Sequence, residues 1–174
     1  MQTDIAPVAW VRAARPADAP AIREVAVLAW RATYAGRVAD GTIERFLATA
    51  YSEERIGVRI HRHDVLVAGR HGRAAAVEAF AEVASHADHI QLVAVYTLPS
   101  VRGHGLGTAL VQAVRSAYPD RDLAADVLLG NEFAEPFYAA RGFEPGERLT
   151  DEIAGELVRE RRWWLRAGAS GEVR

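Results

Sequence analysis

The 174-residue sequence contains no cysteine and no lysine. Without cysteine, a disulfide framework, a thiolate metal site and a cysteine nucleophile are all excluded. Without lysine, a phosphate loop of the Walker type is excluded as well, because that loop needs a lysine before its serine or threonine. All 21 basic side chains are therefore arginine.

Several classes of partner also lack their sequence signatures. The formal net charge is −2 and no basic block is present, so no nucleic-acid partner is predicted. The chain does not start with a basic segment followed by an apolar run, and no apolar run reaches membrane-spanning length. We therefore predict no secretory signal, no membrane partner, no metal cofactor and a cytoplasmic location.

The composition that is present is that of a globular protein. Apolar residues make up 50% and charged residues 25% of the chain, and its length suits one domain. We predict one domain over residues 1–166, followed by a loose C-terminal tail over 167–174.

Apolar periodicity predicts an α/β (α+β) fold with a mixed sheet of six to seven strands and about four flanking helices. The predicted strands cover 8–12, 65–68, 75–85, 89–97, 123–129, 143–149 and 159–166, and the predicted helices cover 19–32, 42–50 with a continuation through 53–61, 108–117 and 131–141. Trp163 and Trp164 are adjacent in the last strand, so they must face opposite sides. One is predicted in the core and the other exposed or in an interface, which leaves a homodimer through the late strands open.

The most specific local pattern is the glycine-rich segment 101–108, VRGHGLGT, which lies between a predicted strand and a predicted helix. A helix N-terminus offers unpaired backbone N–H groups and a partial positive charge. Glycines at positions 103, 105 and 107 remove side chains that would hold an anion away from these groups. Arg102 adds a positive charge and Thr108 a hydroxyl donor. The segment therefore predicts a phosphate or pyrophosphate site.

Other readings of the same segment are weaker. A dinucleotide-binding turn would have the spacing Gly-x-Gly-x-x-Gly, but the third position is Leu106 when counted from Gly103 and Thr108 when counted from Gly105. A glycine-rich turn without a ligand and an unrelated nucleotide-binding protein remain alternatives. A nucleotide-binding protein would be recognised by ATP or NAD competing with the ligand that occupies this segment.

The sequence resembles the GNAT (GCN5-related N-acetyltransferase) family, in particular its small bacterial-type members. The family's coenzyme A loop, Arg/Gln-x-x-Gly-x-Gly/Ala, is matched by Arg102, Gly105 and Gly107, and Pro99 matches the usual end of the preceding strand. Further along, Asn131, Ala134, Phe137, Tyr138, Gly142 and Phe143 match the family's Asn-x-x-Ala-x-x-Phe-Tyr-x-x-x-Gly-Phe stretch.

This resemblance implies that the chain is an acetyl-CoA-dependent N-acetyltransferase, in which an amine attacks the thioester directly within a ternary complex. By position, the implied cofactor-binding residues are Val95, Tyr96 and Thr97 at the strand end, Arg102, Gly103, His104, Gly105, Leu106, Gly107 and Thr108 in the loop, and Asn131 near the pantetheine arm. The implied acceptor is a primary amine of a small molecule or a peptide.

The resemblance also implies catalytic roles. Tyr138 matches the tyrosine that protonates the leaving thiolate, although Pro136 in the same predicted helix departs from the family pattern. The family's usual glutamate base falls on Gln91, which cannot accept a proton. The substitutes considered for the base are Glu78, Glu82, His86 and His89, with Glu82 as the first choice.

The missing glutamate supports a second hypothesis, a non-catalytic acyl-CoA-binding module of the same fold. On the acceptor side, Trp30 and Tyr34 belong to a stretch that borders the acceptor cleft in similar proteins, so both are predicted to contact substrate. Packing in the core is the competing interpretation for Trp30.

Overall fold

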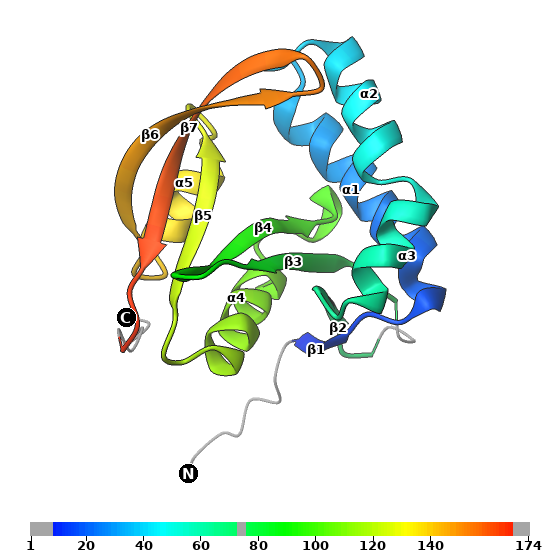
Figure 1. Ribbon diagram of the computed structural model, residues 1–174. Helices are drawn as coiled ribbons and strands as arrows, with labels where there is room; N and C mark the ends of the chain where they lie inside the picture. Colours follow the sequence, from blue (N-terminus) through cyan, green and yellow to red (C-terminus); the bar gives the residue numbers. More distant parts are fainter. Residues whose placement is uncertain (1–8, 73–75, 169–174) are drawn as a thin grey trace.

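The computed structural model describes residues 9–72 and 76–168 and contains a seven-stranded mixed sheet covered by helices on both faces (Figure 1). The strands are β1 (Ala9–Ala13), β2 (Val65–Arg70), β3 (Ala79–Ser85), β4 (His89–Thr97), β5 (Asp122–Leu128), β6 (Glu144–Ile153) and β7 (Glu156–Leu165), and the helices are α1 (Ala19–Tyr34), α2 (Asp40–Ala50), α3 (Glu53–His61), α4 (Leu106–Ala117) and α5 (Ala134–Ala139). No helix of the described part is long and apolar enough to cross a membrane.

The sheet has the order β1-β2-β3-β4-β5-β7-β6 and consists of two halves. Strands β1 to β4 form an antiparallel meander, and β5, β7 and β6 pair antiparallel. The halves meet at β4 and β5, which are parallel and are connected through α4. This strand–helix–strand connection places the N-terminus of α4 beside the end of β4.

The junction between β4 and β5 opens along its length. The two strands pair only from His89 to Leu92 on β4, although β4 continues to Thr97. Between β3 and β4 the register shifts at Glu82, so that Val93 has no partner in the ladder. A bulge of this kind bends and twists a strand. The last part of β4 therefore diverges from β5 and leaves its backbone unpaired on that side.

The core lies on both faces of the sheet. Helices α1, α2 and α3 bury apolar side chains such as Ile22 and Trp30 against Phe80 on one face. On the other face, α4 buries the stripe that includes Leu110 and Val114. Burial of these large side chains stabilises the domain by about 1.5 to 3 kcal/mol for each.

Most predicted elements are present, with differences at their ends. Helix α3 is a separate element, which makes five helices in the described residues instead of about four, because the Ser52 side chain accepts a hydrogen bond from the Arg55 N–H and starts a new helix. Helix α5 covers 134–139 and not 131–141, because the Asn131 side chain accepts from the N–H groups of Phe133 and Ala134 in a turn that precedes it.

The two tryptophans face opposite sides of the sheet and one lies in the core, as predicted, while Trp164 is half-buried. Trp163 is only 6% exposed and packs in the core, whereas Trp164 lies on the other face and donates to Glu147. Positions 8 and 75, predicted in strands, and positions 169–174 of the predicted tail lie outside the described residues.

Candidate active site

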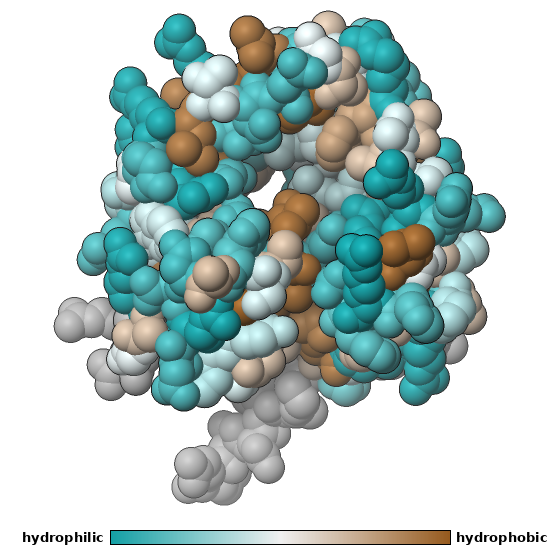
Figure 2. Space-filling view, in the orientation of Figure 1, coloured by the Kyte–Doolittle hydropathy of each residue, from teal (hydrophilic) through white to brown (hydrophobic). Residues whose placement is uncertain are grey.

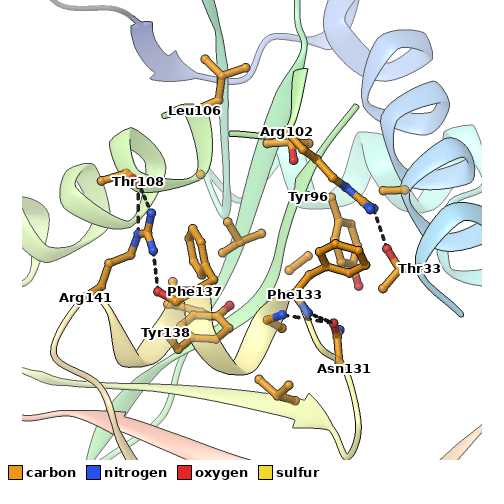
Figure 3. Close-up of a pocket in the computed structure, with 18 of the residues that line it drawn as sticks. Thr33, Tyr96, Arg102, Leu106, Thr108, Asn131, Phe133, Phe137, Tyr138 and Arg141 are labelled. Atoms are coloured by element: carbon orange, nitrogen blue, oxygen red, sulfur yellow. Dashed lines mark hydrogen bonds between the residues drawn. The ribbon is translucent and has the colours of Figure 1, made fainter. Parts of the chain in front are cut away.

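A cavity of about 380 Å³ occupies the space where β4 and β5 diverge. Its walls come from β4, β5, the end of α1, the start of α4 and α5. Figure 2 shows a deep hollow near the centre of the molecule, where Figure 1 has the end of β5 facing α1. Figure 3 shows the side chains that surround the cavity.

The glycine-rich loop forms part of the cavity wall. Gly103 and Gly105 have φ angles of 81° and 80°, which are favourable only for glycine, and Gly105 directly precedes α4. The unpaired N–H groups of the first turn of α4 therefore lie at this part of the wall. Gly107 has another role, because a Cβ there would lie 3.0 Å from the Phe137 ring. Its missing side chain allows α5 to pack against α4.

Most of the predicted cofactor residues come together at the cavity. The wall includes Val95, Tyr96 and Thr97 of β4, Arg102, Gly103, Gly105, Leu106, Gly107 and Thr108 of the loop and α4, and Asn131. His104 does not line the cavity; it is exposed and its Nδ1 lies 3.1 Å from the Val101 carbonyl oxygen.

The strand end from Val95 to Thr97 contributes backbone N–H and C=O groups to the cavity as well as side chains. This part of β4 pairs with β3 on one side, while its other side faces the opening toward β5. Backbone N–H and C=O groups on an unpaired strand edge can bind an extended ligand that lies alongside it. An amide-containing chain fits this edge.

Arg102 extends across the mouth of the cavity. Its guanidinium donates to Thr33 Oγ1 over 2.6 Å and lies 5.1 Å from the centre of the Phe133 ring (Figure 3). It thereby connects α1 with the segment before α5. A cation in this place can meet a negatively charged ligand at the loop.

Arg141 is a second cation at the loop, and sequence reasoning missed it. Its guanidinium donates to Thr108 Oγ1 from Nε over 3.1 Å and stacks 3.6 Å from the centre of the Phe137 ring. Burial lowers the pKa of Arg141. The available signal was its spacing of four residues from Phe137, which puts both side chains on one face of a helical turn.

Tyr138 lines the cavity from α5. Its side chain is buried, and Figure 3 shows the hydroxyl directed toward the middle of the group of labelled side chains. Within the described part of the chain, this hydroxyl makes no hydrogen bond. Burial raises the pKa of Tyr138, with Tyr34 contributing in the same direction and Arg141 opposing. Tyr138 is therefore a protonated donor at neutral pH.

Tyr34 and Asp126 also line the cavity, from the end of α1 and from β5. Burial raises the pKa of Tyr34 to about 12, and the negative charge of Glu160 acts in the same direction. Trp30 does not line the cavity; it is 3% exposed and packs against Tyr34 and Phe46 in the core. Of the two predicted acceptor residues, only Tyr34 reaches the cavity.

The structure does not bring Glu82 to the cavity. Its carboxylate accepts from Arg59 over 2.8 Å, on the side of the sheet where α3 packs. Burial raises the pKa of Glu82, and the charge of Arg59 opposes this shift. The physical reason for the difference is the partner on α3, which removes the carboxylate from solvent and from the site.

The other substitutes for the base do not line the cavity either. Glu78 pairs with Arg70, and His89 interacts with Asp88 and with the Gln91 side chain. His86 stacks on His89. Among the described residues, no three histidine, aspartate or glutamate side chains are grouped so that they could hold a metal ion.

Comparison with known proteins agrees with this geometry. The model of the acetyltransferase (GNAT) family matches residues 22–143, which contain the loop, the cavity and both sequence motifs. The chain belongs to the GNAT family. Its fold is a single GNAT domain, and the family supports an acyl-CoA-dependent acetyltransferase.

Solved structures share the fold of this GNAT domain. PaiA N-acetyltransferase from Thermoplasma acidophilum, in complex with coenzyme A, is 22% identical with a TM-score of 0.76, and the match covers 88% of this chain and 97% of that one. A GCN5-related N-acetyltransferase from Rhodopseudomonas palustris is 24% identical with a TM-score of 0.75, covering 91% and 96%.

A third neighbour acts on a protein. The ribosomal-protein-S18-alanine N-acetyltransferase from Escherichia coli is 18% identical with a TM-score of 0.62, covering 94% of this chain and 97% of that one. No curated protein sequence is a significant match to this chain.

Proposed function

We propose that this GNAT domain transfers the acetyl group of acetyl-CoA to a primary amine of a small molecule or a peptide. The observation that carries the proposal is one cavity that joins three features: a helix N-terminus with a glycine-rich loop, an unpaired strand edge and a buried protonated phenol. These features suit a pyrophosphate, a pantetheine arm and a leaving thiolate, in that order along one extended ligand.

The reaction is a direct transfer. The neutral amine attacks the thioester carbon, the C–S bond breaks, and the Tyr138 hydroxyl donates its proton to the departing sulfur. The positively charged amide nitrogen then loses a proton to the Tyr138 oxygen, which restores the phenol. Backbone groups of β4 from Val95 to Thr97 hold the thioester, while Arg102 and Arg141 neutralise phosphate charge.

The proposed acceptor is a primary amine of one of two types, a small molecule or a peptide. A neighbour of the same fold is named for acetylating the alanine of a ribosomal protein, and another is PaiA N-acetyltransferase. An assay panel of 1,4-diaminobutane, 2-phenylethylamine and an alanyl peptide distinguishes a small-molecule acceptor from a peptide acceptor.

The first test is thermal melting with acetyl-CoA, coenzyme A, ATP and NAD in parallel. A ligand at about 1,000 times its Kd stabilises the folded state by about 4 kcal/mol, which raises the Tm of a domain of this size by about 10 °C. We expect this shift with acetyl-CoA and coenzyme A alone. No shift with either ligand at millimolar concentration would contradict the proposal.

A non-catalytic acyl-CoA-binding module is the second candidate, favoured by Gln91 in the place of the family's usual glutamate. It predicts the same melting shift but no release of free coenzyme A with any amine of the panel. Turnover with one amine is sufficient to reject it.

Replacing Arg102 with alanine tests the phosphate role. We expect the KM for acetyl-CoA to rise about 10-fold while kcat falls less than about 3-fold, because the lost contact is to a part of the cosubstrate that does not react. Steady-state kinetics with varied acetyl-CoA measure both constants. Arg23→Ala, on the exposed side of α1, is the control and should change neither. A larger loss in kcat than in KM would contradict a phosphate role for Arg102.

A further inference from the structure

Phe133 is an exposed aromatic side chain in the wall of the cavity. Its ring is 60% exposed, whereas the other aromatic side chains of the wall are buried or half-buried. None of the three core clusters of the described residues includes it. The ring therefore contributes little to the packing of the fold, and its apolar surface is free for a ligand in the cavity.

The backbone around Phe133 is fixed by hydrogen bonds. The Asn131 side chain accepts from the Phe133 N–H over 3.2 Å, and the Phe133 carbonyl accepts from the Phe137 N–H over 3.3 Å. Side chains four residues apart lie on one face of a helical turn, and both phenylalanines line the cavity. The segment that carries the ring is thus held in place independently of any ligand.

Arg102 lies next to this ring. Its guanidinium is 5.1 Å from the centre of the Phe133 ring and donates to Thr33 Oγ1, and Figure 3 shows the two side chains beside each other. Arg102 is half-buried, and it forms no ion pair within residues 9–72 and 76–168. A half-buried cation without a carboxylate partner favours an anionic ligand. A phosphate on Arg102 and a flat group on Phe133 would be neighbours, as the phosphate and the base of a nucleotide are.

The order of groups along the cosubstrate agrees with this position. In the proposed function the thioester lies at Tyr138, which is 7% exposed, and the pyrophosphate lies at the N-terminus of α4. The adenosine follows the pyrophosphate on the side away from the pantetheine arm, so it extends toward the exposed part of the wall. The other large apolar side chain exposed there is Val93, which has no flat face.

On the basis of the proposed function, we propose that Phe133 is a stacking platform for the adenine of the cosubstrate. The adenine lies on the Phe133 ring while the adjacent phosphate binds to Arg102. The adenosine half of coenzyme A then contributes to affinity, and the site favours acetyl-CoA over thioesters of phosphopantetheine that carry no adenosine.

Two ligands that differ in the adenosine half test this role in the full-length protein. Coenzyme A and 4′-phosphopantetheine share the thiol, the pantetheine arm and one phosphate, but only coenzyme A contains adenine. Phe133→Ala should raise the Kd for coenzyme A about 10-fold, which is within the range for loss of one base–aromatic stack. The Kd for 4′-phosphopantetheine should change less than about 2-fold. Titration calorimetry measures the first constant, and displacement by coenzyme A measures the second.

The same comparison separates stacking from a positioning role. If the ring served only to hold Arg102 in place, Phe133→Ala would weaken both ligands equally, because both carry a phosphate. Phe133→Trp should keep the Kd for coenzyme A within about 3-fold of the wild type, since an indole also offers a flat aromatic face.

Controls identify which proposal fails. Leu157→Ala, at an exposed apolar position of β7 outside the cavity, should change neither Kd, and melting without ligand should show that Phe133→Ala is folded. An unchanged Kd for coenzyme A in Phe133→Ala, or an equal loss for both ligands, would overturn the stacking platform alone. A wild type that does not bind coenzyme A would overturn the proposed function and the platform together.

Discussion

Replacing Tyr138 with phenylalanine is expected to lower kcat about 1,000-fold and to leave the affinity for coenzyme A within about 3-fold. The hydroxyl faces the cavity and has no hydrogen-bond partner among the described residues, so the variant removes a proton donor and little packing. A positioned acid or base contributes about 100- to 10,000-fold to a rate. Turnover is measured by the release of free thiol, and affinity by titration calorimetry with coenzyme A.

The raised pKa of Tyr138 also predicts how the rate depends on alkaline pH. Because burial raises it above the ordinary value of 10, the phenol should stay protonated through the whole accessible alkaline range. The wild-type rate should therefore show no decline attributable to Tyr138 up to about pH 10. Tyr118→Phe, at the end of α4 and outside the cavity, is the matched control and should keep full activity. An unchanged kcat in Tyr138→Phe would remove Tyr138 from the mechanism while leaving the fold intact.

The parts of the site that could be predicted from sequence are those whose geometry is local. The glycine-rich loop combines positive φ angles at Gly103 and Gly105 with the start of a helix, and both features depend on neighbouring residues. Tyr138 belongs to the short helix that is connected to Asn131 by backbone and side-chain hydrogen bonds. Short-range constraints of this kind are visible as spacing in a sequence.

The parts that could not be predicted depend on pairing between distant segments. Glu82 was a reasonable base on a strand beside the loop, but its partner Arg59 lies 23 positions away on α3. The contact of Arg102 with Thr33 likewise joins residues 69 positions apart. No local pattern distinguishes Glu82 from an exposed carboxylate. Its environment follows from burial and charge, which a single sequence does not contain.

The ion pair of Arg59 and Glu82 leads to the largest expected effect on stability. Arg59→Met should lower the free energy of unfolding by about 3 to 5 kcal/mol at pH 8, because it leaves a buried carboxylate without its partner. It also removes the hydrogen bonds that Arg59 donates to the carbonyls of Ala50 and Arg55. Native domains are stable by only about 5 to 15 kcal/mol, so the loss is a large fraction of the total. Urea denaturation at several pH values measures it.

The pH dependence identifies the cause of that loss. The pKa of folded Glu82 is already raised above its ordinary value of 4.5 by burial, and Arg59 is the main opposing charge. Arg59→Met should raise it further, so the folded variant binds the Glu82 proton more tightly than the unfolded chain does. The deficit should therefore be smallest below about pH 4.5 and grow as the pH rises through the folded pKa.

A second substitution at the same pair provides the control. Arg59→Met combined with Glu82→Gln removes the buried charge, so it should recover about half of the loss and show little of the pH dependence. Arg62→Met, exposed just after α3, should change stability by less than about 0.5 kcal/mol. A deficit in Arg59→Met that does not vary with pH would mean that the carboxylate reaches water by another route.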